Sequence, residues 1–216
     1  MNKTALVIGA TGLVGSELVK LLIADSRFGR VIVFARKSTT VTAEKLEEHI
    51  IDFDKPESWS DLVKGDVLFS CLGTTLSQAG SKDAQYKIDY TYQYQFAQAA
   101  ATNGVKTYIL VSSAGADPKS MIFYSRIKGE LERDVKKLPF NSVYLIQPSL
   151  LVGERENSRF GEKLSFRILT ALNSFGLFKK YKPITGNTVA KALLNASIKA
   201  EKGHREITLD KVFDLS

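Results

Sequence analysis

The sequence has little of the residues that mark several specialised protein classes. Its one cysteine, Cys71, cannot form an intrachain disulfide, and the two histidines, His49 and His204, lack metal-ligand spacing, so no metal site is expected. No run approaches the ~20 apolar residues that a membrane-spanning helix needs. The N-terminus carries no signal-peptide pattern. We therefore expect a cytoplasmic protein that does not associate with membranes.

The charge of the chain also excludes some partners. The net charge is +7, but the basic residues are spread thinly and form no aromatic-interleaved surface or reading helix. Nucleic acid is therefore not an expected partner. With 44% hydrophobic and 25% charged residues among 216, the chain can bury a core in one domain over residues 1–216.

Apolar runs alternate with segments of helical period along most of the chain. The continuously apolar runs predict strands buried on both faces, which is typical of a parallel sheet covered by helices. The sequence therefore predicts an α/β fold with a doubly wound, mostly parallel sheet of Rossmann type. The predicted strands are 4–8, 30–35, 49–53, 66–73, 106–113 and 142–149, and the predicted helices are 15–25, 83–102 and 120–137.

After Pro148 this rhythm loosens. We expect helices over 159–177 and 187–200 and a last strand over 204–210. Residues from about 150 to 216 would form a small elaboration on the substrate side.

A glycine-rich turn, "GATGLVG", follows the first predicted strand. Gly9 permits a tight turn, Gly12 leaves the backbone open to a pyrophosphate, and Gly15 lets the following helix pack closely. The free N–H groups of that helix would face the phosphates. This order of strand, glycine turn and helix predicts a dinucleotide site.

The end of the second strand indicates which dinucleotide binds. NAD sites place an acidic residue there for the ribose 2′-hydroxyl, but this strand ends in "ARKST", with Arg36 and Lys37. These cations suit a 2′-phosphate, so NADP(H) is favoured. NAD(H) remains possible, because Arg36 could instead stack on the adenine.

The stretch "YSRIK" places Tyr124 four residues before Lys128, on one face of the predicted helix over 120–137. A nearby ammonium lowers the pKa of a tyrosine and prepares it for acid/base work. The pair Ser112–Ser113 ends the preceding strand, where a hydroxyl could polarise a carbonyl.

These motifs together resemble the short-chain dehydrogenase/reductase superfamily. The longer strings "CLGTTLSQAGSKDAQYKIDY", "VSSAGAD" and "QPSLLVGERENSRFGEKL" resemble its atypical branch, which includes the Tat-interacting oxidoreductase-like protein and bacterial relatives. The resemblance implies Tyr124 as acid/base, Lys128 as its partner on the coenzyme ribose, and Ser113 as the substrate-orienting serine. Ser112 remains an alternative.

The resemblance also assigns a place to Asp89, in "KIDY", where the superfamily has an asparagine on its fourth helix. The backbone carbonyl there holds a water that leads to the lysine, and the carboxylate could keep Lys128 charged. The other interpretation is an ordinary helix residue with an exposed carboxylate. Arg155 and Arg159 would border the substrate pocket or lie in a solvent-exposed loop.

The expected coenzyme contacts lie at the glycine turn and at the ends of the following strands. Cys71 is interpreted as an apolar residue of its strand and not as a nucleophile. Thr74 has an alternative role in a turn. The full expected set is Gly9, Thr11, Gly12, Leu13, Val14, Gly15, Arg36, Lys37, Asp52, Cys71, Leu72, Gly73, Thr74, Ser112, Tyr124 and Lys128.

The sequence supports two main functions. The first is an NADP(H)-dependent oxidoreductase that reduces an unknown small carbonyl substrate, with Tyr124 giving the proton. The second is an NADPH-binding regulatory or protein-interaction module with little turnover, because only about 65 residues follow Pro148. A nucleotide-sugar epimerase shares the glycine pattern, but such chains are typically much longer.

Overall fold

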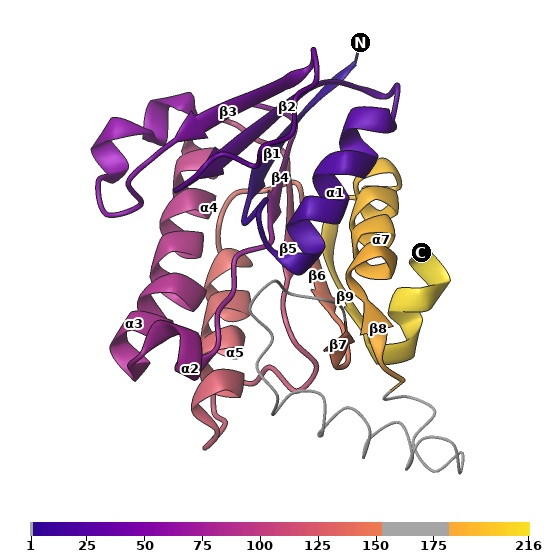
Figure 1. Cartoon of the computed structure of the whole chain (residues 1–216). Helices are drawn as coiled ribbons and strands as arrows, with labels where there is room; N and C mark the ends of the chain where they lie inside the picture. Colours follow the sequence, from indigo (N-terminus) through magenta and orange to yellow (C-terminus); the bar gives the residue numbers. More distant parts are fainter. Residues whose placement is uncertain (1, 153–181) are drawn as a thin grey trace.

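Seven parallel strands form the centre of the molecule in the computed structural model, which describes residues 2–152 and 182–216 (Figure 1). Their order is β3-β2-β1-β4-β5-β6-β9, and every neighbouring pair runs parallel. The predicted doubly wound parallel sheet is confirmed. The strands are β1 Lys3–Ile8, β2 Phe28–Ala35, β3 Leu46–Ile50, β4 Val67–Ser70, β5 Thr107–Val111, β6 Ser142–Gln147 and β9 Gly203–Thr208.

Helices cover both faces of this sheet. Ala5 and Val7 of β1 enter one apolar cluster, and Leu6 and Ile8 enter the other, as the pleat of a strand requires. Figure 1 shows α1 and α7 on one face and α4 and α5 on the other. Burial on both faces explains the continuously apolar strands. The long helices are α1 Leu13–Ala24, α4 Tyr92–Thr102, α5 Phe123–Val135 and α7 Gly186–Ile198.

Shorter elements complete the described part of the chain. The two-residue strands β7 and β8 pair in parallel beside the main sheet. No helix in the two described ranges is long and apolar enough to cross a bilayer. The short elements are α2 Leu76–Ala79, α3 Lys82–Tyr86, β7 Leu151–Val152, β8 Ile184–Thr185, the π-helical turn η3 Lys87–Thr91, and the 3₁₀ turns Pro56–Ser58, Ser60–Leu62 and Leu209–Leu215.

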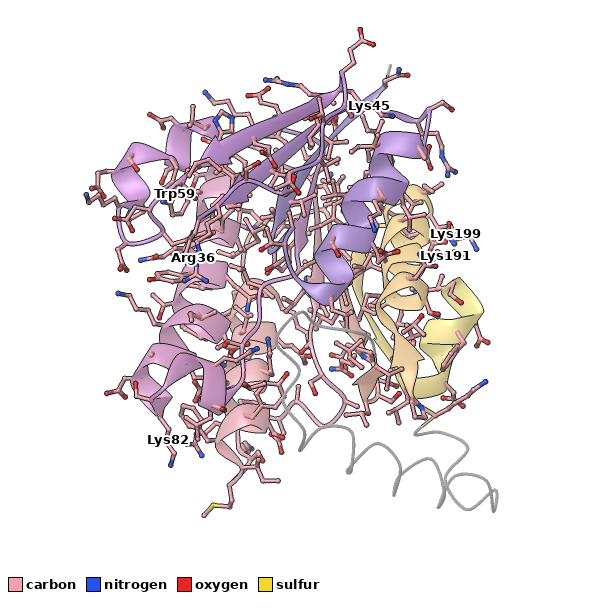
Figure 2. The ribbon with its side chains drawn as sticks, in the orientation of Figure 1. Arg36, Lys45, Trp59, Lys82, Lys191 and Lys199 are labelled. Carbon is pink, nitrogen blue, oxygen red and sulfur yellow. The ribbon has the colours of Figure 1, made fainter. Side chains whose placement is uncertain are left out.

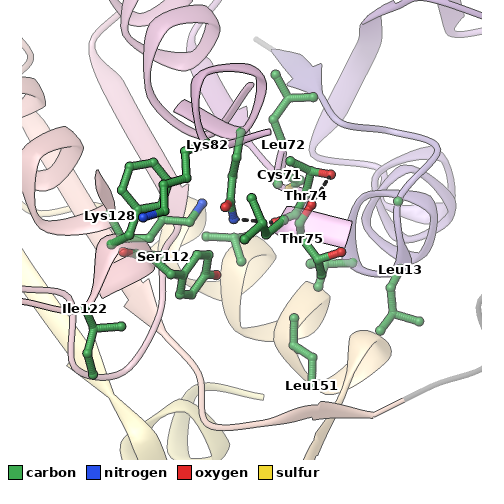
Figure 3. Close-up of a pocket in the computed structure, with 18 residues that line it drawn as sticks. Leu13, Cys71, Leu72, Thr74, Thr75, Lys82, Ser112, Ile122, Lys128 and Leu151 are labelled. Atoms are coloured by element: carbon green, nitrogen blue, oxygen red, sulfur yellow. Dashed lines mark hydrogen bonds between the residues drawn. The ribbon is translucent and has the colours of Figure 1, made fainter. Parts of the chain in front are cut away.

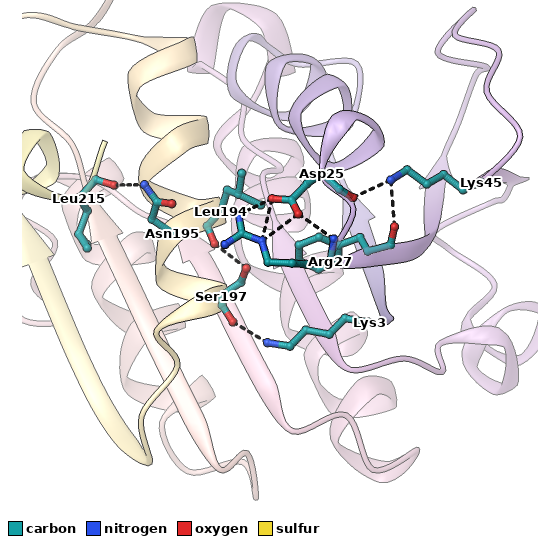
Figure 4. Close-up of polar contacts among 9 residues, drawn as sticks. Lys3, Asp25, Arg27, Lys45, Leu194, Asn195, Ser197 and Leu215 are labelled. Atoms are coloured by element: carbon teal, nitrogen blue, oxygen red, sulfur yellow. Dashed lines mark hydrogen bonds and ion pairs between the residues drawn. The ribbon is translucent and has the colours of Figure 1, made fainter. Parts of the chain in front are cut away.

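Lysine side chains connect the sheet to its helices at the end where the strands begin, opposite their carboxyl ends. Lys45 Nζ donates to the carbonyls of Asp25 and Phe28, at 2.7 and 2.9 Å, just after α1 (Figure 4). Lys3 Nζ donates to the carbonyl of Ser197 in α7 at 3.1 Å. These bonds satisfy carbonyls at two helix ends, so this edge is structural.

Some predicted boundaries were wrong. The third strand spans Leu46–Ile50 instead of 49–53, because as an edge strand it is only half-buried and its sequence "LEEHI" lacks a continuous apolar run. The predicted helix over 83–102 is interrupted by the π turn η3. The predicted helix over 159–177 lies outside the described residues, and so do Arg155 and Arg159.

Candidate functional site at the carboxyl ends of the strands

The turn between β1 and α1 requires its glycines. Gly9 has φ +80°, and a Cβ there would lie 2.4 Å from the carbonyl carbon of Cys71. A Cβ on Gly15 would lie 2.1 Å from the carbonyl oxygen of Gly9, so glycine lets α1 pack on the turn. Gly12 lines a pocket, and a side chain there would occupy that space. The three glycines therefore have the roles that a dinucleotide turn needs.

The start of α1 suits a phosphate group. The helix begins at Leu13, and no side chain caps its first turn. Its first N–H groups are therefore available, and the helix dipole adds positive potential there. The residues present fit the pyrophosphate of a dinucleotide.

A pocket of about 440 Å³ opens beside this turn (Figure 3). It lies between β1 and β4, where the strand order reverses, which is the usual ligand position in such sheets. Its lining comes from the glycine turn, the segment after β4, α3, the end of β5, the start of α5 and β7. The lining residues are Gly12, Leu13, Val14, Cys71, Leu72, Gly73, Thr74, Thr75, Leu76, Lys82, Gln85, Val111, Ser112, Ile122, Phe123, Tyr124, Lys128 and Leu151.

Tyr124 and Lys128 both reach this pocket from α5, one helical turn apart. Tyr124 keeps 38% of its surface exposed, so a ligand can reach it. The Nζ of Lys128 lies 5.9 Å from the centroid of the Tyr124 ring. Lys128 itself is only 2% exposed. The arrangement places a buried ammonium next to an accessible phenol.

Asp89 neutralises that ammonium. Its Oδ1 lies 2.8 Å from Lys128 Nζ, and Asp89 is fully buried. Burial alone would lower the pKa of Lys128, but the charges of Asp89, Tyr124 and Glu132 outweigh it and raise that pKa. Lys128 therefore stays protonated at neutral pH. The alternative of an ordinary exposed carboxylate at Asp89 is wrong.

The surroundings of Asp89 hold its carboxylate in place. Its Oδ2 accepts from the backbone N–H of Thr74 at 3.2 Å. Its backbone carbonyl accepts from the Gln93 side chain at 2.9 Å, so this carbonyl is already bonded within the protein. Gly73 passes close by, and a Cβ there would lie 3.5 Å from Asp89 Oδ1 and 3.8 Å from Lys128 Nζ. The carboxylate contacts the lysine directly, so it is close enough to keep Lys128 charged.

The two candidate serines have different environments. Ser112 belongs to the pocket lining and is 5% exposed. Its hydroxyl oxygen is buried, makes no hydrogen bond of full geometry among the described residues, and lies beside the Glu132 carboxylate, whose pKa it lowers. Ser113 does not line the pocket, and its hydroxyl donates weakly to the carbonyl of Ala114 at 3.3 Å. An unpartnered buried hydroxyl is costly unless a ligand or water satisfies it. The structure thus brings Ser112 to Tyr124 and Lys128, and not Ser113.

A buried carboxylate lies behind the site on the same helix. Glu132 follows Lys128 by one turn, and both of its oxygens accept from the Gln147 side chain, at 2.8 and 3.0 Å. Burial raises the pKa of Glu132.

Cys71 also lines the pocket, and burial raises the pKa of its thiol to about 12. It therefore remains a thiol at neutral pH and is no nucleophile.

The predicted adenosine-side residues lie outside the pocket lining. Arg36 and Lys37 are exposed after β2, and neither forms an ion pair within the described part of the chain (Figure 2). Glu48 of β3 holds the next loop, accepting from Ser38 Oγ at 2.6 Å and from Thr39 N at 2.8 Å. Of the remaining expected contacts, Asp52 and Thr11 are exposed and do not line the pocket either.

Sequence reasoning missed part of the lining. Lys82, Gln85, Ile122, Phe123 and Leu151 all face the pocket. Gln85 is 3% exposed, and its Nε2 donates to the carbonyl of Thr74 at 3.4 Å. The signal that could have indicated Lys82 is the helix start at "SKDA", where Ser81 accepts from the N–H of Ala84 at 3.1 Å and so fixes the first residue.

Comparison with known proteins identifies the family. Residues 9–145 match the family described as NAD(P)H-binding. Protein HTATIP2 of Rattus norvegicus is 31% identical over 214 residues, which cover 97% of this chain and 87% of that protein. The chain belongs to the atypical short-chain dehydrogenase/reductases. The resemblance carried by the sequence motifs is confirmed.

Fungal proteins are also relatives of this short-chain dehydrogenase/reductase. "Protein FMP52-1, mitochondrial" of Scheffersomyces stipitis is 36% identical over 94% of this chain and 92% of its own length. "Protein FMP52, mitochondrial" of Saccharomyces cerevisiae is 38% identical over 86% and 84%. These names, which place the relatives in mitochondria, contradict the expected cytoplasmic location. Low cysteine content argues only against an oxidising compartment, so it could not make this distinction.

Solved structures share the fold of this family member. MoeE5 in complex with UDP-glucose and NAD superposes with a TM-score of 0.73 at 17% identity, over 95% of this chain and 75% of that chain. A UDP-N-acetylglucosamine 4-epimerase from Methanobrevibacter ruminantium gives a TM-score of 0.73 at 17% identity, over 99% and 80%. At this identity the likeness concerns the fold alone.

Proposed function

We propose that this protein is an NADP(H)-dependent oxidoreductase that reduces a carbonyl compound, with Tyr124 as the acid/base. One observation carries the proposal. An accessible tyrosine in the pocket lies beside a buried lysine that a buried carboxylate keeps charged, with 2.8 Å between Lys128 Nζ and Asp89 Oδ1. A cation in this position stabilises a phenolate, which makes the tyrosine a better proton donor and acceptor.

The proposed reaction assigns one role to each group. The bound coenzyme would supply a hydride to the carbonyl carbon. Tyr124 gives its proton to the carbonyl oxygen, and the resulting phenolate is stabilised by the Lys128 ammonium. Ser112 donates a hydrogen bond to the same oxygen as negative charge develops there. Ser112 takes the role first expected of Ser113, because Ser112 belongs to the pocket lining and Ser113 does not.

We further propose that the coenzyme is NADP(H) in preference to NAD(H). The support is Arg36 and Lys37, two cations after β2 that no described carboxylate neutralises. Glu48 fixes the loop that follows them, so their backbone is held. A guanidinium pairs with a 2′-phosphate but gains nothing from a 2′-hydroxyl of NADH.

This preference predicts a difference in affinity. NADPH should bind about tenfold or more tightly than NADH, and Arg36→Ala should remove most of the difference by weakening NADPH alone. Isothermal titration calorimetry with both coenzymes measures it. Lys64→Ala, at another exposed lysine, serves as the control and should change neither affinity. Equal binding of NADH and NADPH to the unmodified protein would defeat the assignment.

The acid/base role is tested by one substitution. A panel of aldehydes and ketones is first screened for NADPH oxidation. Tyr124→Phe should reduce turnover of any active compound by about 10²–10⁴-fold, while the NADPH dissociation constant stays nearly unchanged. Tyr94→Phe, at a half-buried tyrosine of α4 that does not line the pocket, should keep turnover.

Two results would contradict this function. Full activity of Tyr124→Phe would remove the proposed proton donor. No oxidation of NADPH by any carbonyl compound, together with tight NADPH binding, would instead favour the regulatory or protein-interaction module.

A further inference from the structure

The pocket lining carries an uneven charge. Among the described residues that line it, two are cationic, Lys82 and Lys128, and none is acidic. The charge of Lys128 is matched by buried Asp89 at 2.8 Å. Lys82 forms no ion pair with any described carboxylate. The described lining therefore keeps one positive charge that nothing in it neutralises.

The position of Lys82 is fixed by the fold. It is the first residue of α3, whose start is capped by Ser81. Its Nζ lies 5.5 Å from the centroid of the Phe123 ring, at the start of α5 and next to Tyr124. A cation over an aromatic ring keeps its donors available for an anion. The ammonium therefore lies at the start of α5, in the same pocket lining as Tyr124.

Lys82 is also separated from the phosphate end of the site. Figure 3 shows Lys82 and Leu13, the first residue of α1, on opposite sides of the pocket. The pyrophosphate would lie at the start of α1, because the free N–H groups are there. The Lys82 ammonium, on the other side of the pocket, is thus available for a group other than the pyrophosphate.

A second observation concerns the same space. Ser112 is a lining residue that is 5% exposed, and its buried hydroxyl, next to the Glu132 carboxylate, makes no hydrogen bond of full geometry in the described ranges. A ligand with a polar oxygen near Ser112 and Tyr124 could satisfy this hydroxyl. An anionic group elsewhere on that ligand could reach Lys82.

We propose that Lys82 binds an anionic group, a carboxylate or a phosphate, of the substrate. This rests on the proposed function in placing the carbonyl end of that substrate at Tyr124. It names the substrate class as an anionic carbonyl compound, because the described lining offers an ammonium that no described carboxylate pairs with.

Binding to the NADPH-loaded protein tests this without requiring turnover. The probes are 4-carboxybenzaldehyde, 4-formylphenyl phosphate and the neutral methyl 4-formylbenzoate, titrated by ligand-observed NMR. At least one anionic probe should bind about tenfold more tightly than the ester, which is the effect of one charge-assisted contact. The tighter of the two anions identifies the preferred group, and either order supports the site.

Variants assign this preference to Lys82. Lys82→Met should remove the tenfold preference, and Lys82→Arg should restore most of it, while NADPH affinity stays within about twofold in both. Lys191→Met, at an exposed lysine of α7 far from the pocket, is the matched control and should keep the preference (Figure 2).

Several results would overturn the inference. They are equal binding of anionic and neutral probes, no binding of either anion at millimolar concentration, and loss of the preference in Lys191→Met. A large loss of NADPH affinity in Lys82→Met would assign the lysine to the coenzyme instead. An anion preference without turnover would leave this inference standing while contradicting the proposed reduction.

Discussion

The buried pair of Lys128 and Asp89 is the residue-level feature on which the site depends most. Both groups are withdrawn from water, which costs free energy that their attraction and the Thr74 N–H must offset. Such a pair is a weak source of net stability. Its consequence is functional, because it fixes the charge and the place of the ammonium beside Tyr124.

Removing one partner should be costly. Asp89→Asn leaves a buried ammonium without its carboxylate, so the free energy of unfolding should fall by about 3–5 kcal/mol. Without Asp89, burial lowers the pKa of Lys128, and turnover should fall with it. Urea unfolding measures the stability. Asp54→Asn, which breaks the exposed pair with Lys87, is the control and should change the stability little.

An Asp89→Asn protein as stable as the unmodified one would contradict the paired state. The same loss in Asp54→Asn would show that any ion pair gives this result.

The raised pKa of Lys128 also fixes a pH dependence of the stability. The charged Lys128 contributes its full stabilisation at pH values below about 10.4, the pKa of a lysine in the unfolded chain. This contribution is lost as the pH rises through the higher pKa of Lys128 in the folded protein.

Some of these residues could be predicted from the sequence, and others could not. The four-residue spacing of Tyr124 and Lys128 sets one helix face, and the structure has both in one pocket. The choice between Ser112 and Ser113 could not be made, because adjacent residues at a strand end point to opposite sides. Lys82 has no spacing relation to Tyr124 and Lys128. The "SKDA" pattern indicates that Lys82 begins a helix, and the folded chain then shows this helix start at the pocket.

At the scale of elements, α5 carries the proposed acid/base and its lysine, and its position depends on Gly129. A Cβ on Gly129 would lie 2.3 Å from the carbonyl carbon of Asp117 and 2.3 Å from the nitrogen of Pro118. The loop after β5 thus packs directly on the helix backbone, one residue after Lys128. This contact sets the distance between the helix and the end of β5.

Gly129→Ala should therefore displace α5. We expect a loss of about 1–3 kcal/mol in the free energy of unfolding, which is the usual cost of overpacking, and a larger fractional loss of turnover than of NADPH affinity. Ser125→Ala on the same helix should cost less than about 0.5 kcal/mol. Thermal melts and steady-state kinetics measure these effects, and unchanged kinetics in Gly129→Ala would show that the loop yields without moving the helix.

Most elements were predictable because their apolar runs are long and buried on both faces, as in β1, β5 and β6. The edge strand β3 was misplaced, since its half-exposed residues give no such run. The π turn at Lys87–Thr91 was also missed. Its residues continue the helical pattern on both sides, and nothing in that pattern indicates a wider turn.

At the scale of the whole molecule, the strand order decides where the parts of the site meet. The order reverses between β1 and β4, so the glycine turn and the segment after β4 face one another. The end of β5 and the start of α5 close the same space. With Lys82 and Gln85 of α3 and Leu151 of β7, residues from six separate parts of the chain thus converge at the carboxyl ends of the strands.

The most direct test of the account is a crystal structure of the protein grown with excess NADPH. The account predicts a nicotinamide ring against Tyr124, with its ribose hydroxyls at about 3 Å from Lys128 Nζ and the pyrophosphate at the start of α1. A nicotinamide bound away from Tyr124, or a Tyr124 phenol turned into solvent in that complex, would contradict it.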